Sequence, residues 1–168
     1  MRAIAVLILL CCLGLLAGGC SPAVQGSYAL SRGDHAQALA HFNEALARNP
    51  DSAYLMTRIG QVHFDKADYS KAEEAFLSAL AKDPTYPDAQ LYLGLSRIGK
   101  GEREAGFDTL DAYRTPFKFF HQKFVREEAQ RLRKHPEMSA REIIRSILDA
   151  QAAGEVEQKR EERDINNF

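Results

Sequence analysis

The sequence lacks the motifs that most often mark an enzyme. It has no glycine-rich phosphate loop, no paired-histidine metalloprotease motif and no Gly-x-Ser-x-Gly nucleophile turn. None of its five histidines has a histidine four residues away or a nearby cysteine, so their spacing predicts no metal site. An excess of one charge is also absent, because 22 Lys and Arg stand against 23 Asp and Glu. The near-neutral chain offers no general attraction to nucleic acid. We therefore predict no catalytic site, cofactor, metal or nucleic-acid partner.

Apolar residues are crowded at the N-terminus. Fifteen of the first 19 residues are Ala, Val, Ile, Leu, Met or Cys, and Met1 and Arg2 place positive charge ahead of the run. A basic start, an apolar centre and the small residues Ala17, Gly18 and Gly19 form the three-part layout of a secretory signal. A membrane-spanning helix is the alternative, but it needs about 20 apolar residues, and this run ends in Gly-Gly-Cys-Ser-Pro without stop-transfer charges. We predict that residues 1–19 are a signal peptide.

The end of this segment, Leu-Ala-Gly-Gly-Cys at residues 16–20, resembles a bacterial lipobox. The resemblance implies that Cys20 becomes the first mature residue and carries diacylglycerol on its sulfur and a fatty acid such as palmitate on its amine. More than one acyl chain is what stable membrane attachment requires. Ser21 follows in place of an aspartate, and by the sorting rule of such lipoproteins this favours the outer membrane.

The cysteine count agrees with this interpretation. Cys11 and Cys12 lie in the segment to be removed, which leaves Cys20 alone in the mature chain. No disulfide, zinc site or catalytic thiol is therefore expected. The alternative for Cys20 is a free thiol at an ordinary signal-peptidase site.

The rest of the chain contains a repeat of 34 residues. Small residues, aromatics and prolines recur at this spacing, with apolar positions at helical intervals. Each unit is therefore predicted to form two antiparallel helices, which the small residues allow to approach closely. The recurring sets are Gly26, Gly60 and Gly94; Ala38 and Ala72; Phe42 and Phe76; Ala45 and Ala79; Gly33, Ala67 and Gly101; and Pro50 and Pro84.

This pattern resembles the tetratricopeptide repeat family, in which small residues, an aromatic and a proline occupy fixed places in a 34-residue unit. The unit at residues 53–86 matches best. The unit before it has a truncated first helix that begins near Ala23, and the unit from Pro87 departs from the pattern, as terminal repeats do. The resemblance implies an all-α solenoid of about three helical hairpins over residues 20–116.

Two further helices are predicted at residues 117–154. The first runs from about Phe117 to Lys134, and a capping box of Ser139 and Glu142 begins the second. Residues 155–168 are almost wholly charged, which predicts a solvated helical extension or a frayed tail. The apolar faces of the two helices contain Phe117, Phe120, Phe124, Val125, Ala129 and Leu132, then Ile143, Ile144, Ile147 and Leu148.

The resemblance also implies a set of partner-binding residues, because the first helix of each repeat lines the inner groove in this family. They are Tyr54, Thr57, Gln61, Phe64 and Asp65 in the second repeat and Asp88, Leu91, Leu95 and Ile98 in the third. The first set combines aromatic contact area with polar groups that suit a peptide main chain. The second set has three aliphatic side chains that are unfavourable when exposed together. Either a C-terminal helix covers them or a hydrophobic peptide or partner helix binds there.

The segment 114–134 carries seven basic and two acidic residues. The candidate basic surface consists of Lys118, Lys123, Arg126, Arg131, Arg133 and Lys134. The interleaved phenylalanines have the helical spacing typical of a packed face, which argues against nucleic-acid binding. Two alternatives remain, namely contact with anionic lipid and a solvated basic face whose apolar side packs in the core.

Together these features predict a non-catalytic scaffold, lipid-anchored in a bacterial cell envelope at the periplasmic face of the outer membrane. It would bind a protein or peptide partner at the membrane, as an accessory factor in envelope assembly or secretion does. Tethering confines groove and partner to a thin layer, so a modest affinity suffices. The alternatives are a structural subunit of a larger envelope complex and, with less support, an envelope enzyme.

Overall fold

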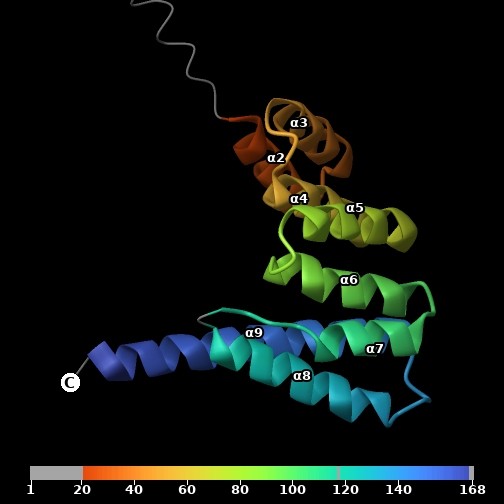
Figure 1. The fold of residues 1–168 in the computed structure, drawn as a ribbon, viewed down its shortest axis with the longest axis vertical. Coiled ribbons are helices and arrows are strands. Elements are labelled where there is room, and N and C mark those ends of the chain that lie inside the picture. The colour runs from red at the N-terminus through yellow and green to blue at the C-terminus, as the bar shows by residue number, and fades with distance from the viewer. Residues whose placement is uncertain (1–20, 117, 167–168) are drawn as a thin grey trace, which may run out of the picture.

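The computed structural model describes residues 21–116 and 118–166; the predicted signal peptide and Cys20 lie outside the described residues. This part of the chain is all helical, as predicted, and has no strand (Figure 1). None of its helices is long and apolar enough to cross a membrane. The helices are α2 (Pro22–Ser31), α3 (His35–Arg48), α4 (Ala53–Asp65), α5 (Tyr69–Lys82), α6 (Pro87–Gly99), α7 (Arg103–Asp111), α8 (Phe119–Arg133) and α9 (Ala140–Asn166).

The first six helices form the three predicted hairpins, α2 with α3, α4 with α5 and α6 with α7. The hairpins are stacked in chain order along the long axis of the molecule, and α8 and α9 close the far end (Figure 1). The first hairpin has the shorter first helix, because α2 has 10 residues while α4 and α6 have 13. The predicted truncation of the first repeat is therefore confirmed.

Local sequence signals fix the ends of these helices. Asp34 accepts a hydrogen bond from the amide of Gln37, and Ser52 accepts one from the amide of Leu55, so both are N-caps. The predicted capping box is also confirmed, since the amide of Glu142 donates to the Ser139 hydroxyl while the amide of Ser139 donates to the Glu142 carboxylate. The turn inside each hairpin has one residue in the left-handed region, which glycine adopts most easily. These residues are Gly33, Ala67 and Gly101, with φ of 73°, 57° and 91°.

Each hairpin is held by a side chain of its second helix that packs directly over a glycine of its first helix. In the second repeat the two helices lie so close that a Cβ atom on Gly60 would come within 2.5 Å of the Phe76 ring. Gly26 faces Phe42 in the same way, and Gly94 faces Leu110. Phe76 also stacks on Tyr92 of the next repeat, with ring centroids 5.8 Å apart. Phe76 thus holds the two helices of its own hairpin together and also packs against the next repeat, as predicted.

Successive repeats pack the first helix of one against the second helix of the one before. Leu55 and Val62 of α4 are buried in one apolar cluster with residues of α3. One repeat later, Ala89 and Leu93 of α6 are buried with residues of α5. Because Ala89 lies 34 positions after Leu55, the same side of the first helix makes the joint in both repeats.

The C-terminal hairpin, formed by α8 and α9, packs against the third repeat and closes that end of the solenoid. Helix α8 packs against α7, while α9 packs against α6 and α8. Helix α9 continues past Gly154 to Asn166, so residues 155–166 are a helical extension and not a frayed tail. Gly154 does not end the helix, because it lies where α9 meets the start of α8, and a Cβ atom there would lie 2.7 Å from the Phe120 carbonyl oxygen.

Replacement of Gly60 by alanine tests the close packing within the repeat. The added methyl group would overlap the Phe76 ring, whose movement is limited by the stacked Tyr92. Overpacking of this kind lowers the free energy of unfolding by about 1 to 3 kcal/mol. Urea denaturation of Gly60→Ala measures it, with Ser70→Ala on the exposed side of α5 as the control. Equal stability of the two variants would contradict the described packing.

Candidate functional site

Tyr54 and Asp65 of α4 are exposed to solvent at the two ends of one side of the helix. Tyr54, Arg58, Gln61 and Asp65 follow one another at intervals of four, three and four residues, so they form a single stripe. We call these four residues the α4 stripe. Tyr54 is 42% exposed, and its hydroxyl lies 3.3 Å from the Ser27 hydroxyl of α2. Asp65 is exposed at the other end of the stripe.

Arg58 was not among the predicted site residues, although it lies at the centre of the stripe. Its Nη1 donates to the Gln61 side-chain oxygen at 2.6 Å, and its guanidinium carbon lies 5.7 Å from the centre of the Phe42 ring. The Arg58 Nε atom is buried and has no hydrogen-bond partner among the described residues. The spacing of Arg58 from Tyr54 and Gln61 would have placed it on the same helix face.

The surroundings of the stripe shift the pKa of several groups. Burial by neighbouring protein atoms raises the pKa of the Asp65 carboxyl above its ordinary value, against the opposing effect of His35 and Arg58. Burial also raises the pKa of Tyr86 and Tyr92, and nearby carboxylates add to the effect.

Three of the predicted residues of the second repeat, including Gln61 of the α4 stripe, are less exposed than expected. Thr57 is 1% exposed, and its hydroxyl donates to the Ala53 carbonyl oxygen, while Gln61 is 8% exposed. Phe64 is half-buried, with its ring in edge contact with Tyr69 and Tyr92 at centroid distances of 5.5 and 5.1 Å. Thr57 and Phe64 therefore contribute mainly to packing.

The predicted groove residues of the third repeat are not open. Leu91, Leu95 and Ile98 are 0%, 0% and 1% exposed, because Ile143 and Ile147 of α9 pack in the same cluster. The prediction that these aliphatic residues line an accessible groove is wrong. Of the two alternatives, a C-terminal helix of the same chain covers them. Burial of each such side chain stabilises a protein by about 1.5 to 3 kcal/mol, which favours the covered arrangement.

Asp88 is the one residue of that set that remains exposed, and it faces a polar cavity of about 400 Å³. The cavity lies where the start of α6 meets α8 and α9. Burial lowers the pKa of His121, and burial with the nearby Asp88 carboxylate raises the pKa of Tyr113. The lining residues are Tyr86, Pro87, Asp88, Tyr113, Thr115, Pro116, Lys118, His121, Gln151 and Glu155.

The six residues of the predicted basic surface do not form one patch. Arg131 makes two hydrogen bonds to Glu128, and Arg133 lies within ion-pair distance of three carboxylates of α7. Lys118 lines the polar cavity, whereas Lys123 and Arg126 line a separate hollow beside the exposed Phe119. Lys134 is exposed at the far end of α8. Internal ion pairs therefore neutralise part of the positive charge.

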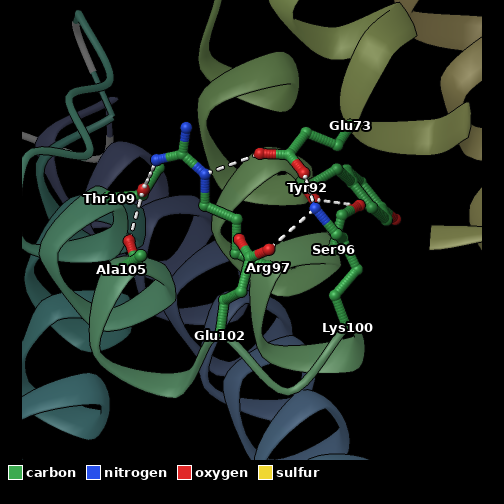
Figure 2. A network of polar contacts seen from close by, with 8 residues as sticks. All are labelled: Glu73, Tyr92, Ser96, Arg97, Lys100, Glu102, Ala105 and Thr109. Atoms are coloured by element: carbon green, nitrogen blue, oxygen red, sulfur yellow. Dashed lines mark hydrogen bonds and ion pairs between the residues drawn. The ribbon is translucent and has the colours of Figure 1, made fainter. Parts of the chain in front are cut away.

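A network of ion pairs fixes α6 relative to its neighbours. Figure 2 shows Glu73 of α5 between Arg97 and Lys100 of α6, with the Arg97 Nε donating to the Glu73 carboxylate at 2.9 Å. Arg97 also donates to the Thr109 hydroxyl of α7 at 2.8 Å. Burial alone would raise the pKa of Glu73, but the hydrogen bonds from Lys100 and Arg97 outweigh it and lower the pKa.

Within residues 21–116 and 118–166, no group of three or more His, Cys, Asp or Glu residues is placed to hold a metal ion. The titratable groups of the stripe come from α4 alone, whereas those of the polar cavity come from α6 and its N-cap Tyr86, from α8 and α9, and from the segment between α7 and α8. Their chemistry is that of hydrogen bonding and charge pairing.

A model of the tetratricopeptide repeat family matches residues 24–87 and 57–116, which together make up more than half of the chain. The chain belongs to the tetratricopeptide repeat family. The three hairpins α2 with α3, α4 with α5 and α6 with α7 are the tetratricopeptide repeats of this chain. Such repeats are interaction modules that bind protein partners and are generally non-catalytic.

Among curated proteins, the chain is similar to the photosystem I assembly protein Ycf3 of Cuscuta gronovii. The two are 33% identical over 103 residues, which cover 54% of this chain and 61% of that protein. The Cuscuta obtusiflora protein matches to the same extent. The chain therefore spans about three fifths of the length of these relatives.

Among solved structures, three tetratricopeptide repeat domains have the same fold. The TPR2B domain of yeast Sti1, in a complex with pHsp70, has a TM-score of 0.54 at 19% identity and covers 79% of this chain and 94% of that one. The second such domain of human RPAP3, in complex with the HSP70 peptide SGPTIEEVD, gives 0.53 at 14% identity, over 80% and 92%. The Sgt2 domain of Aspergillus fumigatus gives 0.53 at 18% identity, over 88% and 80%.

Replacement of Glu73 by glutamine tests the network that positions α6. Because the Glu73 side chain is only 12% exposed, we expect the free energy of unfolding to fall by about 2 kcal/mol at neutral pH. Its pKa in the folded state lies below the ordinary 4.5, so the stabilisation is present above pH 4.5 and is lost as the pH falls through the folded-state value. Denaturation of both proteins across this pH range should show the difference shrinking in acid. Glu74→Gln, an exposed neighbour, is the control, and a difference from wild type that does not change with pH would contradict the assignment.

Proposed function

We propose that this protein is a lipid-anchored scaffold of a bacterial cell envelope that binds a protein partner through the α4 stripe and catalyses no reaction. The observation that carries the proposal is the exposure of Tyr54 and Asp65 at the two ends of the α4 stripe, with Arg58 partly exposed between them. These three side chains are the polar and aromatic groups that the stripe offers to a partner.

The stripe suits a peptide segment of mixed polarity. Tyr54 offers an aromatic ring with few rotatable bonds, and Arg58 offers N–H donors to a carbonyl or carboxylate. Asp65 accepts from an amide, hydroxyl or ammonium group of the ligand. The HSP70 peptide bound by the human RPAP3 domain ends in EEVD, which has three acidic residues. In this protein Asp65 and Asp88 are exposed and add negative charge to the face, so we infer that its partner segment is less acidic.

The anchor is proposed on the sequence at residues 1–20. A basic start, an apolar run and a lipobox-like end before Cys20 support lipidation, and Ser21 supports retention at the outer membrane, where the protein faces the periplasm. There it would act as an accessory factor in envelope assembly or secretion, since its repeats are interaction modules.

Replacement of Cys20 by alanine tests the anchor. The variant should be found in the soluble periplasmic fraction, because it has no sulfur to carry the diacylglycerol. Cell fractionation with immunodetection measures this, and Ser21→Ala serves as the control that keeps the cysteine. If Cys20→Ala stays as firmly bound to membranes as the wild type, lipid on Cys20 is not the anchor.

A second candidate function is that of a structural subunit in a larger envelope complex. It is favoured by the C-terminal part of α9, which extends past the other helices (Figure 1). Two apolar side chains of α9, Val156 and Ile165, are 66% and 65% exposed. Such a subunit would stack against other proteins without use of the α4 stripe.

The variant Tyr54→Ala/Asp65→Ala distinguishes these two functions. Partners are first identified by crosslinking of the anchored wild-type protein in its own cells, followed by mass spectrometry. The loss of an aromatic contact and a charged hydrogen bond should reduce capture of the partner by at least about tenfold. Phe64 is left unchanged, because its ring packs against Tyr69 and Tyr92.

The matched control is Leu77→Ala, which removes an exposed side chain of α5. Circular dichroism and thermal melting of all variants should remain close to wild type, because the substituted side chains are exposed. Full capture by a folded Tyr54→Ala/Asp65→Ala variant would reject the stripe and support the structural subunit.

A further inference from the structure

Tyr28 of α2 is exposed at a position that the later repeats bury. The residues 34 and 68 positions after it are Val62 of α4 and Ser96 of α6, and both are 0% exposed, whereas Tyr28 is 64% exposed. Val62 is buried in one cluster with residues of α3, the helix before α4. Among the described residues no helix precedes α2.

The side of α2 that carries Tyr28 is apolar at its centre. Val24 is 58% exposed and Tyr28 is 64% exposed, one helical turn apart on α2. They border a hollow of about 360 Å³ between α2 and α3, which is also lined by Ala29, Arg32 and His41. The Arg32 guanidinium carbon lies 5.5 Å from the centre of the Tyr28 ring. We call Val24, Tyr28 and Arg32 the α2 face.

The predicted lipid attachment point lies immediately before this face. Cys20 directly precedes Ser21, and α2 begins at Pro22, so no linker separates the anchor from the folded domain. Two residue steps span at most about 7 Å, and the whole of α2 is about 15 Å long. The α2 face therefore begins, at Val24, within about 10 Å of Cys20, next to the headgroup region of the bilayer that would hold the acyl chains.

We propose that the α2 face is a lipid-contact surface that seats the N-terminal end of the solenoid on the bilayer to which Cys20 is anchored. The inference rests on the proposed lipid anchor. Val24 and the Tyr28 ring enter the headgroup region, where a tyrosine ring with a wet hydroxyl is stable, and Arg32 pairs with lipid phosphate. The lipid supplies the apolar cover that α3 supplies to Val62 in the next repeat.

The chemistry of the face favours lipid over a second copy of the chain. A stable dimer interface involves about 20 to 30 residues on each side, whereas this face belongs to one helix of 10 residues. A single helix face beside a tyrosine and an arginine is, in contrast, sufficient for interfacial contact when acyl chains already hold the protein at the membrane.

The absence of tryptophan from the chain allows a direct test with one fluorescent probe. The full-length Tyr28→Trp variant is purified from bacterial membranes, its lipid is verified by intact mass, and it is reconstituted into vesicles of phosphatidylethanolamine and phosphatidylglycerol. The reference is the Tyr28→Trp protein that also carries Cys20→Ala, measured in solution without detergent. Relative to this reference, the proposal expects the tryptophan emission of the vesicle-bound protein to be shifted to the blue. It also expects this emission to be quenched when the lipid acyl chains carry bromine near the headgroups. Phe119→Trp, exposed by 65% at the other end of the solenoid, is the control and should emit as in water.

Every other outcome overturns the proposal in an identifiable way. A blue-shifted emission that brominated lipid does not quench would mean that protein, either a second copy or residues 1–19, covers Tyr28. Emission typical of water in a lipidated, vesicle-bound protein would mean that nothing covers it. A mass without acyl chains would overturn the proposed anchor itself, and the two failures are thereby distinguished. Val24→Glu in the Tyr28→Trp background should reduce the quenching, because it places a carboxylate among the lipid headgroups.

Discussion

In each repeat, the contact between a glycine of the first helix and a large side chain of the second helix sets the distance between the two helices. Gly60 and Phe76 show it most clearly, because no Cβ atom would fit between them. The same ring stacks on Tyr92, so the contact that closes one hairpin also positions the next. The ion pairs of Glu73 with Arg97 and Lys100 then hold α6 against α5. The spacing and direction of the inner-face side chains depend on these contacts.

The inner face is unequal along its length, and the C-terminal hairpin is the cause. Helix α9 lies over Leu91, Leu95 and Ile98, as a further repeat would, and seals that end of the solenoid. Tyr54 and Asp65 of the α4 stripe stay exposed, and so do Val24 and Tyr28 of the α2 face at the N-terminal end. We propose that these two surfaces serve two occupants, a partner on the stripe and a bilayer on the α2 face.

The repeat spacing was sufficient to predict the hairpins and their turns, and the Ser139 and Glu142 pair predicted the capping box, because these features depend on local residue types at fixed intervals. It could not predict which inner-face residues stay exposed. That depends on where α9 packs, and α9 is far along the chain from the residues of α6 that it covers. Gly106 illustrates the limit: in the sequence it is a departure from alanine, whereas a Cβ atom there would lie 2.7 Å from the Gly94 carbonyl oxygen. Arg58 was missed because the family pattern assigns the groove to other positions of the first helix. Its spacing from Tyr54 and Gln61 nevertheless places it on the same face of α4.

Site-specific photocrosslinking in living cells tests the central claim most directly, namely that the α4 stripe is where the partner binds. A photoreactive amino acid is placed at position 54, at position 65 or at position 77, the last on α5 away from the stripe. The account predicts that positions 54 and 65 crosslink to the same protein and that position 77 does not. Crosslinks to a partner from position 77, with none from 54 or 65, would contradict it.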